Sequence, residues 1–334
     1  MSYPRLKAGA SWFNELMSYR DLRVALIVPC YNEEIAIAQV IRGFREAMPC
    51  IEIFIFDNNS SDRTPVVARA ENAHVVTVTS RGKGNVVRRM FADVNADIFV
   101  MVDGDGTYDA PSVVMMVDKL IDEGLDMVVG CRVTPQDVAG SAYRRGHQLG
   151  NRMLTQSVLQ IFGGGFTDML SGYRVFSKRY AKSFPALSKG FEIETELTVH
   201  ALELRMPYGE VMTPYGARAE GSESKLSTYR DGLRILKTIF RLYVSERPFS
   251  FYSICAALMA MFSVLITIPV IVEFFGTGLV PRFPTVILST AIMICALLSL
   301  FCGLILDNVT RGRHEMKCLA YLAIPLHKRY ALRD

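Results

Sequence analysis

"DIFVMVDGDGTYD", residues 97–109, joins an apolar run to a cluster of carboxylates and glycines. Residues 98–102 have the length and the β-branched and aromatic content of a buried strand. The run ends at Asp103, after which Asp105, Thr107 and Asp109 alternate with two glycines and a tyrosine. A strand without a polar face predicts a sheet that is covered on both sides, with its polar groups gathered where the strand ends.

Apolar runs and helix-like segments alternate along the first part of the chain. Strands are predicted at residues 23–29, 51–57, 74–78, 97–103 and 126–132. Helices are predicted at residues 34–47, after residue 64, and at residues 84–94 and 111–123. Apolar strands separated by helices are typical of a mostly parallel sheet with helices on both faces. We therefore expect an α/β domain.

Three of the predicted strands end in polar clusters: PCYNEE at residues 29–34, DNNSSDRT at 57–64 and DGDGTYD at 103–109. The carboxyl ends of parallel strands lie along one edge of a sheet, and ligands bind in the crevice there. We expect the three clusters to meet and to form a binding site. One cluster alone also has a structural interpretation, because Ser61 or Asp62 can cap the helix after residue 64.

Absent motifs narrow the chemistry of this edge. GxGxxG does not follow the first strand and GxxxxGK[ST] occurs nowhere, so neither common nucleotide-binding loop is present. The third cluster resembles the start of a calcium loop, but Tyr108 and Val114 stand where that loop requires Gly and Glu. What remains is D-x-D, in which Asp103 and Asp105 can hold one hard divalent cation that also binds substrate phosphates.

Residues 249–275 and 285–306 form two long apolar runs, the first uncharged before Glu273 and the second uncharged throughout. Both can cross a bilayer. The alternative is a buried hairpin of a soluble protein, but neither run has a polar face. The connecting loop holds Arg282, whereas the flanks hold more basic residues: Arg241, Arg247, Arg311, Arg313, Lys317, Lys328 and Arg329. This bias predicts that both termini lie in the cytoplasm.

An amphipathic helix is predicted immediately before the first span, at residues 227–248. Its basic residues repeat at helical spacing on one face: Arg230, Arg234, Lys237 and Arg241. Its apolar residues fall largely on the other side: Leu233, Leu236, Ile239, Phe240 and Tyr243. Such a helix suits an anionic membrane surface, although a solvated face on an ordinary packed helix gives the same pattern.

Composition argues against several classes of function. The net charge is +4, from 37 basic and 33 acidic residues, so we expect no nucleic-acid partner. The seven cysteines include no CxxC pair, which argues against a zinc or redox site. The first 22 residues carry charges and no long apolar core, so they are interpreted as an N-terminal arm and not as a signal peptide.

The ordered motifs VPCYNEE, DNNSSDRT, RGKGNVVRRM, VDGDGTYD and VVGCR resemble those of the inverting family 2 glycosyltransferases. Three later segments and the two-span anchor resemble the polyprenyl-phosphate (dolichyl-phosphate-type) hexose synthases: TDMLSGYRVFSKR at 167–179, FEIETEL at 191–197 and YGARAEGSESKL at 215–226. The resemblance covers roughly residues 23–310. It implies a GT-A fold, a Rossmann-like domain with a mostly parallel sheet, followed by a C-terminal two-helix transmembrane hairpin.

The resemblance implies a role for each matching position. The nucleotide sugar would be bound by Pro29, Tyr31, Glu33, Asp57, Lys83, Asp103 and Gly104. The metal, Mg²⁺ or Mn²⁺, would be bound by Asp105, Asp103 and Thr107. Phosphates would be bound by Arg132, Arg144, Arg145, Arg218, Ser224 and Lys225. The catalytic residues would be Asp103, Asp105, Asp168 and Arg174, of which Asp168 and Arg174 line the acceptor side.

Some of these roles have alternatives. Many relatives have Gln where this chain has Thr107, so either the Thr107 hydroxyl binds the metal or water fills that position. Many have a second acidic residue where this chain has Asn58, which leaves contacts to the base or the metal open. Arg218, Lys225 and Arg230 could instead serve as anchors at the membrane interface.

We therefore predict a membrane-anchored enzyme that moves a hexose from a nucleotide diphosphate sugar, with a UDP-sugar as the expected donor, to polyprenyl phosphate with inversion. A phosphate monoester is largely ionised near neutral pH and can attack without a strong general base. The expected division is an N-terminal arm (1–22), a GT-A domain (23–226), an interfacial helix (227–248), two spans (249–309) and a cytoplasmic tail (310–334). The expected location is the inner (cytoplasmic) membrane, with two passes and a cytoplasmic catalytic domain.

Two alternatives stay open. One is a family 2 transferase that adds a sugar to another lipid-linked or glycan acceptor in cell-envelope polysaccharide synthesis. A processive synthase is disfavoured because the QxxRW motif is absent and the single tryptophan is Trp12. The other is a membrane-bound binding or assembly protein with a decayed site, which Asp57, Asp103, Asp105 and Lys225 argue against. The sequence is compatible with a homo-oligomer, and no residue identifies the sugar.

Overall fold

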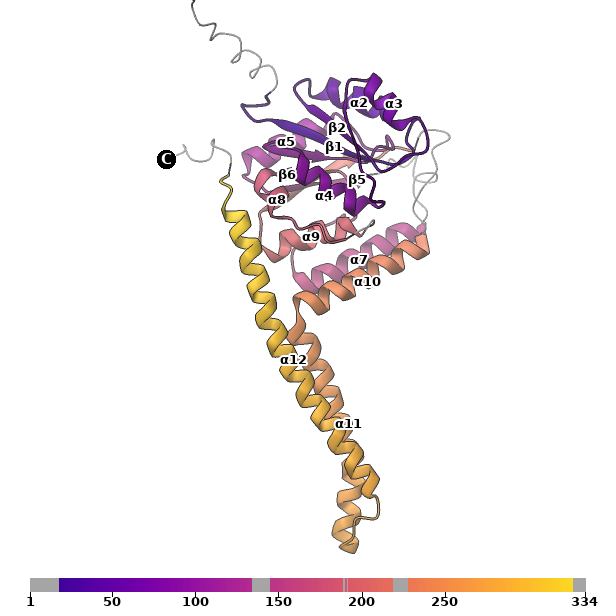
Figure 1. Cartoon of the computed structure of the whole chain (residues 1–334), viewed down its shortest axis with the longest axis vertical. Coiled ribbons are helices and arrows are strands. Elements are labelled where there is room, and N and C mark those ends of the chain that lie inside the picture. The colour runs from indigo at the N-terminus through magenta and orange to yellow at the C-terminus, as the bar shows by residue number, and fades with distance from the viewer. Residues whose placement is uncertain (1–17, 134–144, 189, 191, 219–227, 327–334) are drawn as a thin grey trace, which may run out of the picture. The chain divides into compact units, whose positions relative to one another are not determined.

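The computed structural model describes residues 18–133, 145–188, 190, 192–218 and 228–326, without the side chains of 145–152, 228–232 and 234. In this described part, seven strands form one sheet in the order β3-β2-β1-β4-β6-β5-β7 (Figure 1). The strands are β1 (Val24–Cys30), β2 (Glu52–Asp57), β3 (His74–Thr77), β4 (Ile98–Met101), β5 (Met127–Val133), β6 (Arg174–Ser177) and β7 (Tyr208–Pro214).

The sheet is parallel except for β6, which runs antiparallel between β4 and β5. The five strands predicted from the sequence, β1 to β5, are present, whereas β6 and β7 were not predicted. The chain passes from β1 to β2 on one side and returns to β4 on the other side of β1. This change of direction opens the crevice at the carboxyl ends of β1 and β4 that binds ligands in sheets of this kind.

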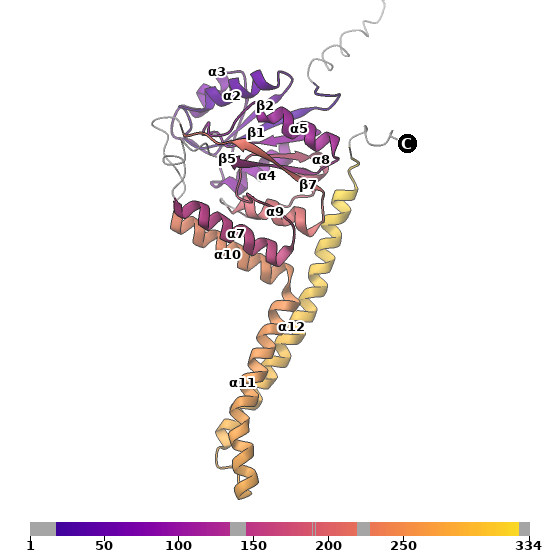
Figure 2. The same cartoon turned by 180° about the vertical axis from the view of Figure 1, so that it is seen from behind.

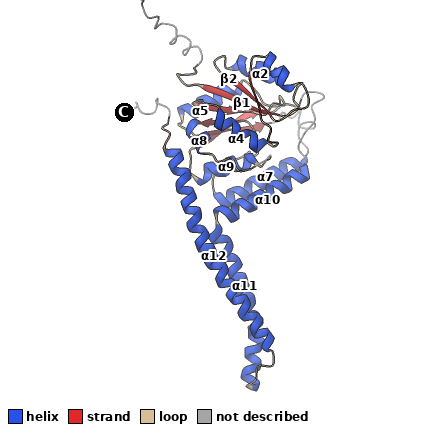
Figure 3. Cartoon of the chain, in the orientation of Figure 1, coloured by secondary structure: helices blue, strands red, loops and turns tan. Residues whose placement is uncertain are grey.

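Helices cover both faces of the sheet (Figure 3). One apolar core joins the sheet to α2 (Ile37–Ala47), α3 (Thr64–Ala70) and α5 (Ser112–Asp122). The other joins it to α4 (Lys83–Asp93), α8 (Lys178–Ser183) and α9 (Ile193–Glu203), with α7 (Arg145–Phe162) at its margin. Successive strand residues enter opposite cores, as Leu26 and Ile27 do. The apolar runs therefore lack a polar face because both faces are buried.

The remaining helices are α10 (Thr228–Glu246), α11 (Pro248–Thr277) and α12 (Phe283–Leu322). The chain divides into two compact units, one of Met1–Leu236 with Lys317–Asp334 and one of Lys237–Met316. The predicted boundary at residue 310 thus falls inside α12, which stays helical as far as Leu322. The end of α12 belongs to the same unit as the sheet.

A buried carboxylate holds the end of α12 within that first unit. Asp126, which is fully buried, accepts a hydrogen bond of 2.7 Å from the hydroxyl of Tyr321. It also accepts two from Arg179, whose guanidinium lies 4.6 Å from the centre of the Tyr321 ring. Lys317 pairs with Glu203 at 2.9 Å. These contacts tie the final turns of α12 to the strand β5 and to α9.

Within the second unit, α11 and α12 lie side by side in both views (Figures 1 and 2). Small or β-branched residues repeat every seven positions on their buried faces: Ala256, Ser263 and Val270 in α11, and Ser289, Ala296, Gly303 and Thr310 in α12. The Ser263 hydroxyl donates to the Ser289 carbonyl at 2.7 Å, and that of Ser299 donates to the Tyr252 carbonyl at 3.2 Å. Small side chains let the helices approach closely, as in membrane helix pairs.

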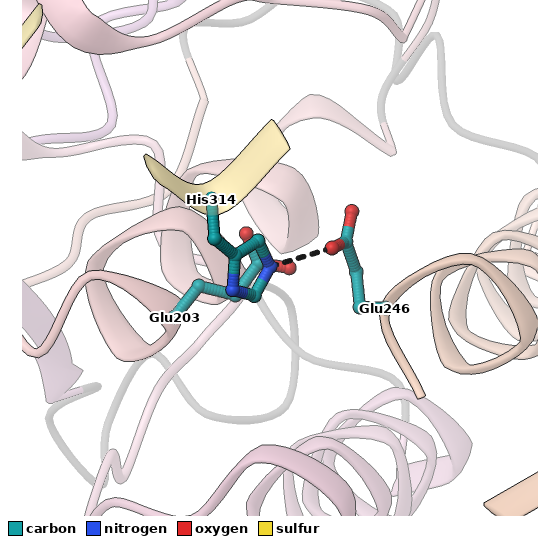
Figure 4. A group of neighbouring side chains, drawn as sticks. All are labelled: Glu203, Glu246 and His314. Carbon is teal, nitrogen blue, oxygen red and sulfur yellow. Dashed lines mark hydrogen bonds and ion pairs between the residues drawn. The ribbon is translucent and has the colours of Figure 1, made fainter. Parts of the chain in front are cut away.

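The outer surface of this hairpin is apolar and exposed, and both helices are long and apolar enough to cross a membrane. Their 30 and 40 residues span about 45 and 60 Å, against a hydrocarbon core of about 30 Å. Polar contacts gather at the two ends. At one end, His314 hydrogen-bonds Glu246 at 2.8 Å (Figure 4). At the other, Arg282 pairs with Glu273 at 3.2 Å.

Replacing Gly303 by Leu tests the close packing of the hairpin. A Cβ at position 303 would lie 2.9 Å from the Cβ of Tyr252 and 3.5 Å from the Cα of Phe249, so the helices must separate. We expect a destabilisation of about 1–3 kcal/mol, as for other overpacked sites, measured as a lower thermal unfolding midpoint in detergent. Gly276→Leu is the control, since nothing lies within 4 Å of its Cβ. An equal midpoint for both variants would contradict the packing described.

Candidate active site

The polar clusters meet at the edge of the sheet where the parallel strands end. The backbone N–H of Asn32 donates to the Ser60 hydroxyl at 2.9 Å, and the Asn32 side chain accepts from the N–H of Ser61 at 2.8 Å. The loop after β1 is thereby joined to the loop after β2. Because β6 is antiparallel, the residues that precede Arg174 reach the same edge, where Arg174 pairs with Met101.

A lysine lies between two carboxylates at the centre of this edge. The Nζ of Lys83, the first residue of α4, is 2.5 Å from Oδ1 of Asp103 and 2.6 Å from Oε1 of Glu194 in α9. Lys83 and Glu194 are almost completely buried, whereas Asp103 is partly exposed. Gly172 closes over Asp103, since a Cβ there would come 2.5 Å from its Oδ2. One ammonium therefore fixes carboxylates from two different elements.

The opposite charges of Lys83, Asp103 and Glu194 explain the direction in which the pKa of Lys83 shifts. Burial alone would lower the pKa of the Lys83 ammonium, but the carboxylates of Asp103 and Glu194 outweigh burial and hold the pKa above its usual value. Burial raises the pKa of the Glu194 carboxyl, and the Lys83 ammonium opposes that shift. Oε2 of Glu194 accepts no hydrogen bond from the described residues. Lys83 is thus charged in the folded protein at neutral pH.

The second aspartate of D-x-D is buried and fully engaged. Oδ1 of Asp105 accepts hydrogen bonds from the hydroxyl of Thr107 at 2.6 Å and from its backbone N–H at 3.2 Å. Oδ2 lies 2.7 Å from a guanidinium nitrogen of Arg218. Only 4 % of Asp105 is exposed, so its negative charge requires a nearby cation, which Arg218 supplies.

These groups fit a divalent cation. Two carboxylates and a hydroxyl are the hard oxygen ligands that Mg²⁺ and Mn²⁺ take in proteins. Asp105 already balances a positive charge in a buried position, which is the electrostatic setting that a metal ion needs. Asp103, Asp105 and Thr107 stay the residues predicted to hold it.

The segment after β7 is fastened to the D-x-D loop. Tyr215 forms a bridge with Tyr108, and their rings lie 5.3 Å apart. The N–H of Gly216 donates to the Thr107 carbonyl at 2.8 Å. The hydroxyl of Tyr108 in turn accepts from the N–H of Gly172 at 2.9 Å. These contacts bring Arg218 to Asp105, although more than a hundred residues separate them.

Arg132 and Asp168 form a two-pronged ion pair on the far side of the loop. The Nε of Arg132 is 2.7 Å from one carboxylate oxygen, and a terminal nitrogen is 2.8 Å from the other. The guanidinium also lies 5.6 Å from the centre of the Tyr215 ring. Asp168 therefore orients Arg132, and the two predicted site residues act as one group.

Arg174 has a different setting from the other predicted residues. It is completely buried and donates to the carbonyls of Met169, Ser171 and Glu194 and to the hydroxyl of Thr198. Burial lowers the pKa of its guanidinium. These contacts hold the turn before β6 against the first turn of α9. The predicted role on the acceptor side stays a prediction, and the burial favours a positioning role.

The predicted nucleoside-binding residues line the ends of β1 and β2. Tyr31 is exposed, Pro29 is half-buried, and Glu33 and Asp57 are buried. The carboxylate of Asp57 accepts from the N–H of Ser60 at 3.3 Å. Gly104 is buried beside Cys30 and Glu33. The alternative of a helix cap is wrong: the residue that precedes α3 is Arg63, and no side chain caps the helix. Asp62 instead accepts from the N–H of Thr64 at 3.0 Å, in the turn before the helix.

Asn58 has a structural role that sequence reasoning missed. Its amide nitrogen donates to the carbonyls of Val78 and Ser80 at 3.0 and 2.8 Å. Its oxygen accepts from the N–H of Gly82 at 2.7 Å. An aspartate could accept but not donate here, so Asn suits the loop that carries Lys83. Glu194 and Tyr108 were also missed, although FEIETEL and DGDGTYD contain them.

Four predicted phosphate ligands cannot be placed. Arg144, Ser224 and Lys225 lie outside the described residues. Arg145 begins α7, but its side chain lies outside the described part. Their roles stay predictions.

Comparison with known proteins decides the family. The model of glycosyl transferase family 2 matches residues 25–184. The glycosyltransferase AglJ of Haloferax volcanii is 35% identical over 230 residues, which are 69% of this chain and 75% of that protein. The chain belongs to glycosyltransferase family 2.

Two further relatives match a shorter part of the chain or match it at lower identity. A Shigella flexneri protein of uncharacterized function is 60% identical over 155 residues, which are 46% of this chain and 95% of that protein. A dolichyl-phosphate hexose transferase of Haloferax volcanii is 26% identical over 224 residues, which are 67% of this chain and 95% of that protein.

The solved structures agree on the fold. Glucosyl-3-phosphoglycerate synthase from Mycobacterium tuberculosis, in complex with Mn²⁺, UDP-glucose and phosphoglyceric acid, has a TM-score of 0.51 with this chain. The sequences are 23% identical, and the match covers 66% of this chain and 78% of that chain. The GT-A fold predicted from the sequence is confirmed. The similarity concerns the fold alone.

Lys83→Met tests the buried charge group of this family 2 glycosyltransferase. Removing one partner of a buried ion pair costs about 3–5 kcal/mol, and here two carboxylates would face each other. In the double variant that combines Lys83→Met with Glu194→Gln, we expect part of this loss to be recovered. The free energy of unfolding is measured by urea unfolding of the protein in detergent. Arg89→Met is the control, because its pair with Asp93 is partly exposed to solvent and contributes under about 1 kcal/mol. A double variant less stable than Lys83→Met would contradict the charge balance.

Proposed function

We propose that this family 2 glycosyltransferase transfers a hexose from a nucleotide diphosphate sugar, with UDP as the expected nucleotide, to polyprenyl phosphate. The transfer would invert the anomeric centre and depend on Mg²⁺ or Mn²⁺. The observation that carries the proposal is the pair Asp103 and Asp105 at the carboxyl end of β4, with the cationic groups of Lys83 and Arg218 within 2.7 Å.

The donor side of the reaction needs charge compensation. A divalent cation held by Asp103, Asp105 and Thr107 would supply Lewis-acid stabilisation to the departing nucleoside diphosphate. Lys83 pairs with Asp103 and orients its carboxylate through their 2.5 Å contact. The partial burial of these groups strengthens their interactions, because water screens them less than it does at the surface. The same residues therefore bind the donor and favour its cleavage.

The acceptor side needs positioning more than base catalysis. A phosphate monoester carries between one and two negative charges at neutral pH, so it is already a nucleophile. Arg132, held by Asp168, offers a guanidinium suited to a phosphate oxygen pair. Arg174 would act indirectly by fixing the turn that contains Asp168. Bringing two anions together in the reactive geometry is the main task of these residues.

The acceptor is expected to be a lipid because the chain has two helices able to cross a membrane. Leu233, Leu236 and Phe240 of α10 are more than half exposed, which suits a helix at a lipid surface. The similarity to a dolichyl-phosphate hexose transferase also supports a lipid-phosphate acceptor. The proposed location is the cytoplasmic membrane, with the catalytic domain and both termini in the cytoplasm.

A transfer assay tests the acceptor. The full chain, in lipid and detergent with Mn²⁺, is incubated with polyprenyl phosphate and a panel of labelled nucleotide hexoses. The expected product is a radiolabelled lipid that releases its sugar in mild acid. If no donor labels polyprenyl phosphate but a lipid-linked glycan is labelled, the alternative acceptor class is supported and the proposal fails.

Asp105→Asn tests the metal role within this assay. The variant keeps the shape of the side chain but loses the charge that balances a cation, so we expect kcat to fall by about 10² or more. Asp109→Asn is a matched control four residues away, where the carboxylate accepts from the N–H and hydroxyl of Ser112 and Asn can also accept. Near-normal turnover of Asp105→Asn would refute the metal role.

A further inference from the structure

Arg218 pairs with Asp105 through the carboxylate oxygen that Thr107 does not contact. Its guanidinium lies 2.7 Å from Oδ2 of Asp105, while the other oxygen of that carboxylate accepts from Thr107. Arg218 is the partner that comes from outside the D-x-D loop. Its side chain is 25 % exposed, whereas that of Asp105 is 6 % exposed. The anion is therefore fixed and buried, and the cation beside it reaches the solvent.

The backbone next to Arg218 is fixed independently of this ion pair. Gly216, two residues earlier, donates its N–H to the Thr107 carbonyl at 2.8 Å, and Tyr215 donates its N–H to the Val133 carbonyl at 3.0 Å. An arginine side chain has several rotatable bonds beyond its Cα. The guanidinium can consequently change its partner while its anchor stays in place.

A guanidinium and a divalent cation compete for Asp105. Both are attracted to the same carboxylate, and two cations at one buried oxygen repel each other strongly because the local dielectric is low. A metal ion that binds Asp105 must therefore displace Arg218. Displacement leaves the guanidinium without this carboxylate, unless another anion is near. A diphosphate bound to the same metal would be such an anion, and arginine binds phosphate oxygens in pairs.

We propose that Arg218 is an exchangeable counter-ion, which neutralises Asp105 in the metal-free enzyme and moves to the donor diphosphate when the metal and the donor bind. The proposal rests on the metal and donor of the proposed function, and not on the identity of the sugar or the acceptor. Arg218 then disfavours a metal ion without a nucleotide and favours the two together. A bound nucleotide therefore strengthens metal binding. By linkage, a bound metal strengthens nucleotide binding by the same factor.

Arg218→Gln tests the exchange by Mn²⁺ binding, measured from the electron paramagnetic resonance signal of free Mn²⁺ with the full chain in detergent. Without nucleotide, we expect the variant to bind Mn²⁺ about tenfold more tightly than the wild type, because the competitor is gone. With saturating Mn²⁺, we expect it to bind UDP or GDP, whichever the wild type binds, about tenfold more weakly, because a phosphate ligand is lost. These opposite changes distinguish exchange from a structural role, which would weaken both.

Two further variants keep the test decisive. Arg218→Lys retains the positive charge, so its Mn²⁺ affinity without nucleotide should stay near that of the wild type even if the Gln variant unfolds. Arg89→Gln removes an exposed ion pair with Asp93 and should change neither affinity. Mn²⁺ binding to Arg218→Gln that equals or is weaker than wild-type binding overturns the proposal, as does tighter binding by the Lys variant.

The binding experiments can be distinguished from the transfer assay, because they contain neither a sugar donor nor a lipid acceptor. Tighter Mn²⁺ binding by Arg218→Gln together with no lipid product supports the exchange and refutes the lipid-phosphate acceptor. Unchanged Mn²⁺ binding together with a lipid product refutes the exchange and leaves the proposed function supported.

Discussion

The buried ammonium of Lys83 forms the interaction on which the edge of the sheet that carries the candidate site depends. It joins α4, the end of β4 and α9 through two carboxylates that would otherwise repel each other. Burial of such charges is tolerated only when they are paired. Asn58 holds the loop before Lys83, and Arg174 holds the first turn of α9, so both supporting contacts serve the same group. Lys83, Asp103 and Glu194 therefore form a balanced group of charges that neighbouring elements hold in place.

The apolar runs in the sequence predicted the strands β1 to β5, which such runs mark directly. The apolar runs of β1, β2, β4 and β5 and their intervening helices follow from the sequence pattern, because these strands are largely buried on both faces. β6 is only four residues long and antiparallel, and its first residue is a buried arginine, so no apolar pattern marks it. Its place between β4 and β5 depends on tertiary pairing, which sequence periodicity does not report.

The sequence pattern identified candidate site residues that follow a strand, whereas residues from distant elements were named only through the family resemblance or were missed. Asp103 and Asp105 stand directly after β4, so the strand's end identified them. Glu194 begins a helix, and its carboxylate is important only because Lys83 lies beside it. The pair of Asp105 with Arg218 likewise depends on the tertiary fold. The pairing of β7 with β5 brings residues Tyr215–Arg218 to the D-x-D loop.

The anchoring of Tyr321 to Asp126 has a consequence for biosynthesis. The unit that contains the sheet is made of two stretches of sequence, and the hairpin of Lys237–Met316 is an insertion between them. The ribosome therefore makes both apolar helices before it makes the turn of α12 that covers Asp126. The first unit is therefore completed only after both apolar helices have been synthesised, and a chain that ended before Lys237 would lack Lys317 and Tyr321 of that unit as well as both helices.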